Sequence, residues 1–385
     1  MLDSKDIPVK LLTRLRRQVL HKHPEVSGYE GRTSERITNF LRSYRPNRII
    51  TGLGGHGVAA IFTRHNSGPN ILIRCELDAL PIMETNTFAH RSVVNGVSHK
   101  CGHDGHAAIV AGLATILSKQ RSSLGQVTLL FQPAEETGEG AAAVLGDWKF
   151  KTLKPDFVFA VHNLPGYPLN AVVIRDGNFT AAVKTLTLEL VGKTAHAAEP
   201  EFGLNPALAV SRIIAGACKL SQPDTKRPDF HLITPVYLQL GHDNSYGTSA
   251  GHGVVKLTIR CWTRKTMKDI TTKVMKMVKE IAASEKLKLS TRWEQEFEPN
   301  TNHPDAIKLV RNAAKENDIK VVERAFPFKW GEDFGLFTQN YKGAMFGIGA
   351  GKNHPALHNP DYDFPDELIP TGVRMFHSII TQIQR

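Results

Sequence analysis

The most regular hydrophobic pattern in the chain is a series of short apolar runs, each followed by polar residues. Three of these runs cover 71–73, 127–131 and 157–161. Unbroken apolar runs are typical of strands buried on both faces, as in a parallel sheet covered by helices. After the first run, a helical stripe is formed by Ile109, Leu113, Ile116 and Leu117. The pattern predicts an α/β domain with a mixed, largely parallel sheet covered by helices.

The pattern changes after about residue 180. Residues 184–190 and 255–261 alternate between apolar and polar side chains, which indicates half-exposed strands of an antiparallel sheet. One helix is expected over 206–220, with Pro206 in its first turn. A second helix is indicated by a stripe of Ile270, Val274, Met277, Val278 and Ile281. Strands with two helices on one face predict an inserted α+β domain of the ferredoxin-like type over 181–292.

The chain then returns to the pattern of its N-terminal part. A helix is expected over 305–317, a buried strand over 344–348 and a closing helix over 370–384. A length of 385 residues suits about two domains. We therefore expect one domain built from 1–180 and 293–385, with the insert between its two parts.

Composition and charge narrow the classes of function. The formal net charge of +11 permits nucleic-acid binding, but the basic residues are dispersed over helical polar faces and no nucleic-acid motif accompanies them. No apolar run approaches the ~18 residues that a membrane span needs, and residues 1–10 contain no signal-peptide core. We expect a cytoplasmic protein that binds neither nucleic acid nor membrane.

The cysteines argue against a disulfide framework, because they lie far apart and form no CxxC pair. They are Cys75, Cys101, Cys218 and Cys261. Cys101 lies among polar residues, whereas the other three fall in apolar or strand-like stretches. We expect those three to be inert core residues.

Polar side chains follow each of the three apolar runs. They are Glu76 and Asp78 after the first, Glu135 and Glu136 after the second, and His162 after the third. The carboxyl ends of parallel strands meet at one edge of a sheet, where α/β proteins commonly bind ligands. Simpler roles remain open. Asp78 can cap the turn before Pro81, and the two glutamates can begin a solvated helix.

Residues 101–106, C-G-H-D-G-H, concentrate metal-binding groups at the start of the first predicted helix. Cys101 and His103 are two residues apart, which suits a turn that points both donors at one ion. A buried cysteine beside solvated histidines is the simpler alternative, but the density of ligand types favours a metal site. His21 and His23, near the end of a predicted helix over 9–20, are expected to cap or pack instead.

Several segments together resemble the M20 metallopeptidase family, in particular its amidohydrolase branch of N-acyl-amino-acid, hippurate and auxin-conjugate hydrolases. In chain order they are H-K-H-P-E-V-S-G-Y-E, E-L-D-A-L-P-I, C-G-H-D-G-H, Q-P-A-E-E, V-H-N-L-P-G, G-K-T-A-H-A-A-E-P and G-E-D-F. They cover nearly the whole chain. The resemblance implies hydrolysis of the amide bond of N-acyl amino acids by a metal-activated water or, as in other M20 branches, of dipeptides.

The resemblance also implies roles for individual residues. Two divalent ions (Zn, Mn, Co or Ni) would be held by Cys101, His103, Glu136, His162 and His358. Cys101 would bridge the ions, Glu135 would be the general acid/base, and Asp78 is a further candidate catalytic residue. His196 would reach the active site of a partner subunit, which makes the insert a dimerisation domain. The alternating strand 184–190 offers an edge that can pair with its copy.

Two segments depart from the pattern of the branch. Residues 248–253 stand where relatives carry an N-V-I-P-like segment, and 297–303, with Asn302, replaces a Y-P-P-T-x-N-D segment. Both lie where relatives grip substrate, so the acyl group and the amino acid stay open. A non-catalytic binding protein on the same scaffold is a further hypothesis, and the intact ligand set with Glu135 counts against it.

Overall fold

The computed structural model describes residues 2, 4–63, 67–120 and 125–384, which fold as two compact units. The first unit comprises Met1–Phe179, Asn300–Ala325 and Asp333–Arg385, and the second comprises Thr180–Pro299 and Phe326–Glu332. The hydrophobic pattern did not indicate that the short segment Phe326–Glu332 belongs to the second unit. Within the described residues, no helix combines the length and apolarity that crossing a bilayer requires.

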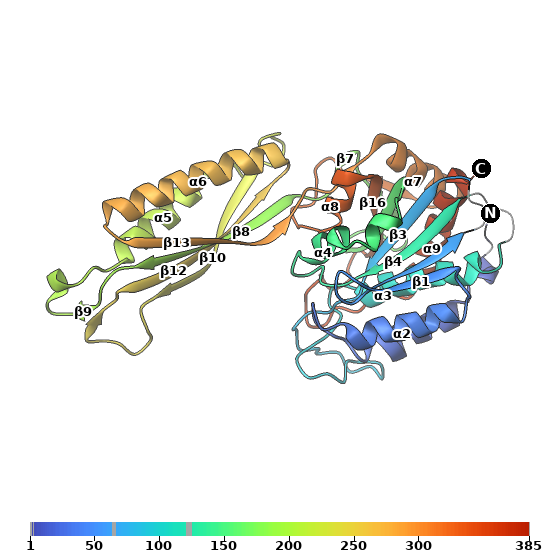
Figure 1. Cartoon of the computed structure of the whole chain (residues 1–385), viewed down its shortest axis with the longest axis horizontal. Helices are drawn as coiled ribbons and strands as arrows, with labels where there is room; N and C mark the ends of the chain where they lie inside the picture. Colours follow the sequence, from blue (N-terminus) through green and yellow to red (C-terminus); the bar gives the residue numbers. More distant parts are fainter. Residues whose placement is uncertain (1, 3, 64–66, 121–124, 385) are drawn as a thin grey trace. The chain divides into compact units, whose positions relative to one another are not determined.

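A mixed sheet forms the centre of the first unit (Figure 1). In the described chain it has eight strands in the order β1-β2-β4-β3-β5-β16-β6-β15. The four strands from β4 to β16 are parallel, and β2 and β6 join them antiparallel, which confirms the predicted mixed, largely parallel sheet. The strands are β1 Arg48–Leu53, β2 Gly57–Thr63, β3 Asn70–Glu76, β4 Gln126–Gln132, β5 Phe157–Pro165, β6 Val172–Ile174, β15 Val321–Glu323 and β16 Lys342–Gly351.

Helices cover both faces of this sheet. Ile71 and Ile73 of β3 belong to the core cluster shared with α3 and α9, whereas α4 and α8 lie on the opposite face (Figure 1). The helices are α2 Gly31–Arg42, α3 His103–Leu117, α4 Gly140–Gly146, α7 Pro304–Glu316, α8 Gly335–Asn340 and α9 Leu368–Ile383. All residues of α3 are buried, so the expected amphipathic helix is instead a central one, enclosed by the sheet and other helices.

The N-terminal helix differs from its prediction in one respect. It begins as α1 (Val9–Arg14) and continues as the π-helix η2 (Leu15–His21). A π-helix has a wider turn than an α-helix, is rare, and frequently occurs at functional sites. Its buried residues include the polar Arg16 and His21, which periodicity alone did not place in the interior.

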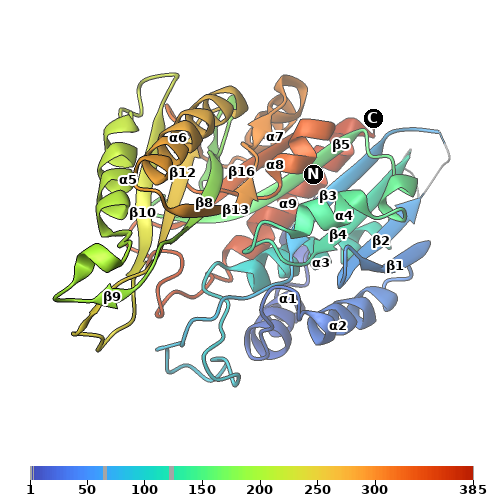
Figure 2. The same cartoon turned by 60° about the vertical axis from the view of Figure 1, so that its left-hand side comes forward.

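The second unit has the β-α-β-β-α-β order of a ferredoxin-like fold. Its strands are ordered β10-β12-β8-β13 and are all antiparallel, and α5 packs beside α6 on one face (Figure 2). The elements are β8 Ala182–Val191, α5 Ala207–Leu220, β10 His231–Leu240, β12 His252–Cys261, α6 Arg264–Ser284 and β13 Lys288–Phe297. Two expectations are wrong. The strand over 184–190 lies between two neighbours and offers no free edge, and Cys218 is exposed on α5 because it lies on the solvent side of that helix.

Candidate metal centre and active site

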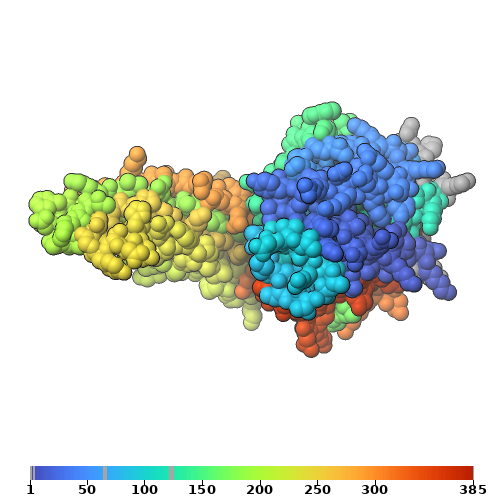
Figure 3. Space-filling view, turned by 90° about the horizontal axis from the view of Figure 1, so that it is seen from below, coloured from blue at the N-terminus to red at the C-terminus, as the bar shows by residue number. Residues whose placement is uncertain are grey.

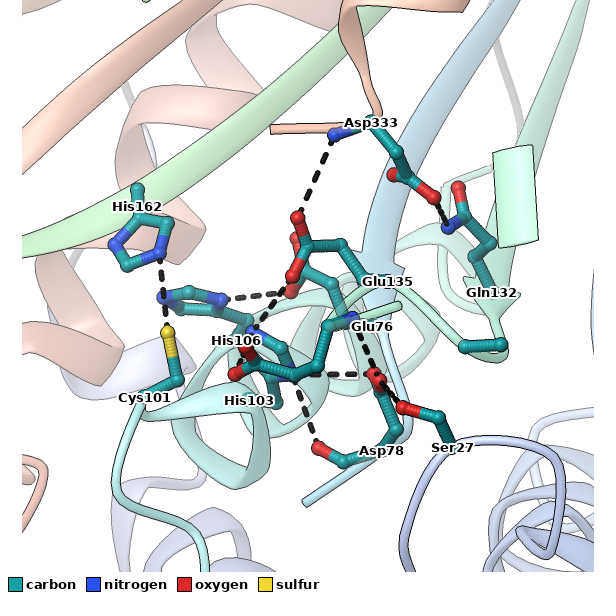
Figure 4. Close-up of polar contacts among 12 residues, drawn as sticks. Ser27, Glu76, Asp78, Cys101, His103, His106, Gln132, Glu135, His162 and Asp333 are labelled. Carbon is teal, nitrogen blue, oxygen red and sulfur yellow. Dashed lines mark hydrogen bonds and ion pairs between the residues drawn. The ribbon is translucent and has the colours of Figure 1, made fainter. Parts of the chain in front are cut away.

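The carboxyl ends of the parallel strands bring the predicted polar residues together (Figure 4). Glu76 is the last residue of β3, Glu135 lies three residues beyond β4, and His162 lies on β5. The connection from β3 to α3 reaches the surface, where Figure 3 shows part of it as cyan atoms, and then returns so that α3 begins at His103. One edge of the sheet therefore collects side chains from four separate segments.

Cys101 is the centre of two sets of ligand atoms. One set comprises Cys101, His103 and His162, and the other comprises Cys101, Glu136 and His358; within each set all atoms lie within 4.8 Å of one another. A cysteine shared by two trios would supply a sulfur ligand to both, and thiolate, imidazole and carboxylate together suit a transition metal such as zinc. The structure thus brings all five predicted ligands into one cluster.

The histidine hydrogen bonds fit a metal site. His103 Nδ1 donates to the carbonyl oxygen of Asp78 at 2.9 Å, and His162 Nδ1 donates to the carbonyl oxygen of Asn163 at 2.8 Å. Each ring therefore turns its Nε2 lone pair toward the cluster. Metal-bound histidines usually donate their other ring nitrogen in this way. His103 Nε2 is buried and makes no hydrogen bond within the described residues, which leaves this nitrogen available to a metal ion.

The negatively charged groups around the cluster also favour the binding of a cation. Burial alone would lower the pKa of His103, but its hydrogen bond to Asp78 and the charge of Glu76 raise that pKa to about 10. Burial and the charge of His106 lower the pKa of His162 to about 3, which keeps this ring neutral. The field that holds a proton on His103 would equally attract a metal ion, and metal binding would displace that proton.

The two adjacent glutamates have different surroundings. Glu135 is buried; one of its oxygens lies 3.7 Å from His103 Nε2, and the other accepts from the amide of Asp333 at 3.4 Å. Glu136 has one oxygen 3.7 Å from His358 Nε2 and the other 3.8 Å from His103 Nε2. The alternative of a solvated helix start is wrong, because these residues form a turn and α4 begins only at Gly140.

Asp78 is buried behind the ligands. Its Oδ2 accepts from the amide of Glu136 at 2.9 Å and from Ser27 Oγ at 2.8 Å, and its Oδ1 lies 3.2 Å from His103 Nδ1. Burial would raise the pKa of Asp78, but the hydrogen bonds and the charge of His103 lower it, so the carboxylate is ionised. Asp78 therefore orients two of the predicted ligands, and Figure 4 shows its contacts with Ser27 and His103.

Sequence reasoning missed a buried network beyond the ligands. Nδ1 of His106 forms a hydrogen bond with Glu76 Oε2 at 2.7 Å, and Nε2 forms one with Asn163 Oδ1. Both ring nitrogens of His106 therefore have a partner. An added Cβ on Gly102, whose φ is 93°, would lie 2.5 Å from Asn163 Oδ1, which only glycine avoids. Arg74 pairs with Glu76 and Asp333. Glu76 and His106 stood in segments that the sequence singled out, but for Arg74 the signal was only an arginine directly after the apolar run 71–73.

The remaining candidates lie elsewhere. His196 is on β9 (Ala195–His196) of the second unit and is exposed; this strand pairs with β11 (Thr248–Ser249), so the unusual 248–253 segment adjoins it. Asn302 binds the backbone of Arg175 and Met345 through its side-chain oxygen and nitrogen. The side chain of Asn302 thus connects β16 to the residue that follows β6, and all of its polar atoms are used in these bonds. His21, expected to pack or cap, is buried and bonds Asp104 at 2.8 Å.

Comparison with known proteins agrees with this site. Residues 72–382 match the model of peptidase family M20/M25/M40. The chain is 30% identical over 365 residues to an N-acetyl-L-cysteine deacetylase of Bacillus subtilis, covering 94% of this chain and 85% of that protein, and 28% identical to a putative amidohydrolase, YhaA, of the same organism, covering 93% and 91%.

The fold has a counterpart among solved structures. The YXEP protein of Bacillus subtilis, described as a dinuclear metal binding peptidase of the M20 family, matches with a TM-score of 0.82 at 25% identity and covers 99% of both chains. Since the family model spans most of the sequence and the ligands converge where the motifs predict, the chain belongs to peptidase family M20/M25/M40 and is a hydrolase of amide bonds.

Proposed function

We propose that this protein hydrolyses the amide bond of N-acyl amino acids with a water activated by two divalent ions. The observation that carries the proposal is the pair of ligand trios sharing Cys101, with Glu135 beside them. The relatives named as a deacetylase and as an amidohydrolase support the acyl substrate. A dipeptide is the second candidate, which the likeness to a protein described as a peptidase favours.

Five residues of this chain would hold the metal: Cys101, His103, Glu136, His162 and His358. When bound, such ions lower the pKa of a water molecule and polarise a carbonyl oxygen. A metal-bound Cys101 would be a thiolate, and Asp78 holds the Nδ1 of His103 so that Nε2 faces the cluster. The protein's contribution is thus a fixed set of donors whose orientation is set before substrate arrives.

Glu135 is the group that we assign to proton transfer. It is close to the ligands, yet it belongs to neither of the two trios that share Cys101. A buried carboxylate at this place can accept a proton from the attacking water and deliver it to the leaving amine. The amide of Asp333 holds one oxygen, which leaves the other directed to the cluster.

The substrate class is tested by reconstitution. The metal-stripped protein is loaded with Zn, Mn, Co or Ni in turn and assayed for amine release from N-acetyl and N-benzoyl amino acids and from dipeptides. We expect cleavage of N-acyl amino acids to exceed that of dipeptides, and none without metal. Faster cleavage of dipeptides would favour the second candidate, and no cleavage with any metal would overturn both.

We further propose a homodimer that forms through the edge strand β10 of the second unit. This strand exposes Val236, Tyr237 and Leu238 at 54%, 46% and 53%, and an apolar hollow of about 410 Å³ lies between it and α5. A long apolar edge strand is expected to be covered by another chain. The opposite edge, β13, carries Lys288, Arg292 and Glu294, which suits solvent.

The family resemblance then assigns His196 to the partner's active site, where it would stabilise the oxyanion of the tetrahedral intermediate. Complementation tests this. Inactive His196→Ala is mixed with inactive Glu135→Gln under conditions that allow subunit exchange. Activity should partly return, because one site of each heterodimer then has both residues. If exchange is proven and no activity returns, His196 does not act across the interface.

A further inference from the structure

The turn that carries Glu135 and Glu136 has a backbone conformation that its sequence does not favour. Ala134, directly before Glu135, has a φ of 53°, in the left-handed region where side chains other than glycine are uncommon. Such residues persist only where the surroundings hold them. The directions of both glutamate side chains depend on this backbone, so whatever holds Ala134 also aims them.

Glu30, from a distant part of the sequence, forms a hydrogen bond with this backbone. Its Oε1 accepts from the amide of Ala134 at 2.8 Å and from the amide of Gly28 at 3.0 Å. On the other side of Glu135, the amide of Glu136 donates to Asp78 at 2.9 Å. Two buried carboxylates from different segments therefore grip the amides on either side of the proposed base.

Glu30 is itself fixed by the turn before α2. The amide of Ala79 donates to the carbonyl oxygen of Glu25 at 2.8 Å, and Ser27 Oγ donates to Asp78. The carbonyl oxygen of Glu30 accepts from the amide of Ser34 in the first turn of the helix at 2.8 Å. One turn thus connects both carboxylates that grip the glutamate turn.

A role for Glu30 in stability alone does not explain its surroundings. It occupies the N-cap position of α2 but makes no side-chain capping bond there. It is fully buried, and its Oε2 has no hydrogen-bond partner within the described residues. Burying a carboxylate in this way costs free energy. We therefore attribute the burial of Glu30 to the hydrogen bond that it accepts from the amide of Ala134.

We propose that Glu30 is a positioning residue, which holds Ala134 in the left-handed conformation and thereby aims Glu136 at the metal and Glu135 at the reacting water. The inference rests on the proposed roles of these two glutamates. Glu30 touches neither substrate nor ligand, and it acts only through the backbone of the turn.

The test uses a rescue that only this role predicts. Glu30→Met removes the acceptor at similar length, whereas Glu30→Gln keeps an oxygen that can accept both amides. Ala134→Gly makes the left-handed conformation accessible without help. Zinc affinity of the full-length protein is measured by chelator competition, together with kcat, KM and the unfolding midpoint.

We expect Glu30→Met to weaken zinc binding about 10–100-fold, the range for residues that orient metal ligands, and to lower kcat with little change in KM. Glu30→Gln and Ala134→Gly should stay close to the parent. The double variant Glu30→Met/Ala134→Gly should regain at least about tenfold of the lost affinity, a coupling that independent sites would not show.

Parent-like zinc affinity and kcat in folded Glu30→Met, or no recovery in the double variant, would overturn the inference. Should Glu30→Met fail to fold, Glu30→Asp, which withdraws the acceptor by one methylene, takes its place in the same comparison. The proposed function fails separately. In that case Glu135→Gln would retain activity, while the zinc measurement would still decide the role of Glu30.

Discussion

The two units of the molecule differ in what they bury. In the first unit the interior holds charged side chains, among them Arg16, Arg74, Lys100, Asp104 and Asp333. Among the described residues of the second unit, by contrast, the buried polar side chains are those of Thr180, Thr185, Thr258 and one charged residue, Glu332. The second unit thus has an almost entirely apolar core, and the first has a core in which many charges are paired.

The difference reflects what each interior has to do. A buried charge is costly unless it is paired, and replacing a buried ion pair by apolar residues is often neutral or stabilising. Several charges of the first unit lie beside the predicted ligands, where Arg74 pairs with Glu76 and Asp333 and Arg16 pairs with Asp104 at 3.0 Å. Such networks fix polar groups before the reaction, which is how active sites stabilise developing charge.

The largest effect is expected at the site itself. Glu135→Gln should lower kcat by about 10²–10⁴-fold, because an amide cannot take the proton of the water, while metal content and fold are kept. Steady-state kinetics with metal analysis measures this. Glu139→Gln, an exposed residue close by, is the matched control and should be near normal. Near-normal turnover of Glu135→Gln would place the base elsewhere.

Removing a charge from the first interior should cost stability. Arg74→Met leaves Glu76 and Asp333 buried without their cation, and breaking a buried pair in this way costs about 3–5 kcal/mol. Urea unfolding of the metal-loaded protein measures the loss. An unchanged unfolding midpoint would show that the charge network contributes nothing to the stability of this unit.

Shortening an apolar side chain in the core of the second unit should destabilise that unit alone. Leu257→Ala, at a fully buried position of β12, should cost about 2–5 kcal/mol through lost burial and a cavity. Hydrogen exchange should show faster opening within 180–299, and zinc affinity should not change. Leu129→Ala, the equivalent change on β4, should speed exchange in the first unit and weaken zinc binding. Equal changes of zinc affinity in both variants would show that the core of the second unit also affects the metal site.

The stability of the first unit should also depend on pH, because of the buried His21. Burial would lower the pKa of His21, but the charge and hydrogen bond of Asp104, with help from Glu84, raise it from 6.5 to about 9. Below pH 6.5 His21 is protonated in both folded and unfolded chains, so its stabilising pairing is complete. The contribution is lost as the pH rises from 6.5 to about 9.

The loss is at most about 3–4 kcal/mol, since one pKa unit corresponds to about 1.4 kcal/mol. Unfolding free energies measured between pH 6 and pH 10 (about the window that this pKa sets) should fall in the parent and fall less in His21→Asn. Equal slopes for the two proteins would refute the assignment.

The smallest effect is expected from an exposed pair in the second unit. Lys184 and Glu296 form an ion pair at the surface, with side chains 30% and 50% exposed. Lys184→Ala should change the free energy of unfolding by about 0–1 kcal/mol, because solvent screens such pairs. A loss as large as that of Arg74→Met would mean that exposure does not separate the two kinds of ion pair.

The sequence by itself determined the α/β class and the family, and it predicted five metal ligands that the fold brings into one cluster. Apolar runs and helical stripes are local features, and the segment C-G-H-D-G-H combines ligand types that rarely occur together by chance. The strands over 71–73, 127–131 and 157–161 were predicted because their apolar runs are almost uninterrupted, which indicates that both faces are buried.

Only the tertiary structure decided which strand lies at an edge and which buried groups meet. β8 alternates like an edge strand, yet β12 and β13 flank it, because strand order depends on the path of the chain and not on periodicity. The bond from Ala134 to Glu30 joins residues 104 positions apart, and Arg74 meets Asp333 across 259. Pairings of buried polar groups over such separations leave no periodic trace in the sequence, since each depends on where the fold brings two segments together.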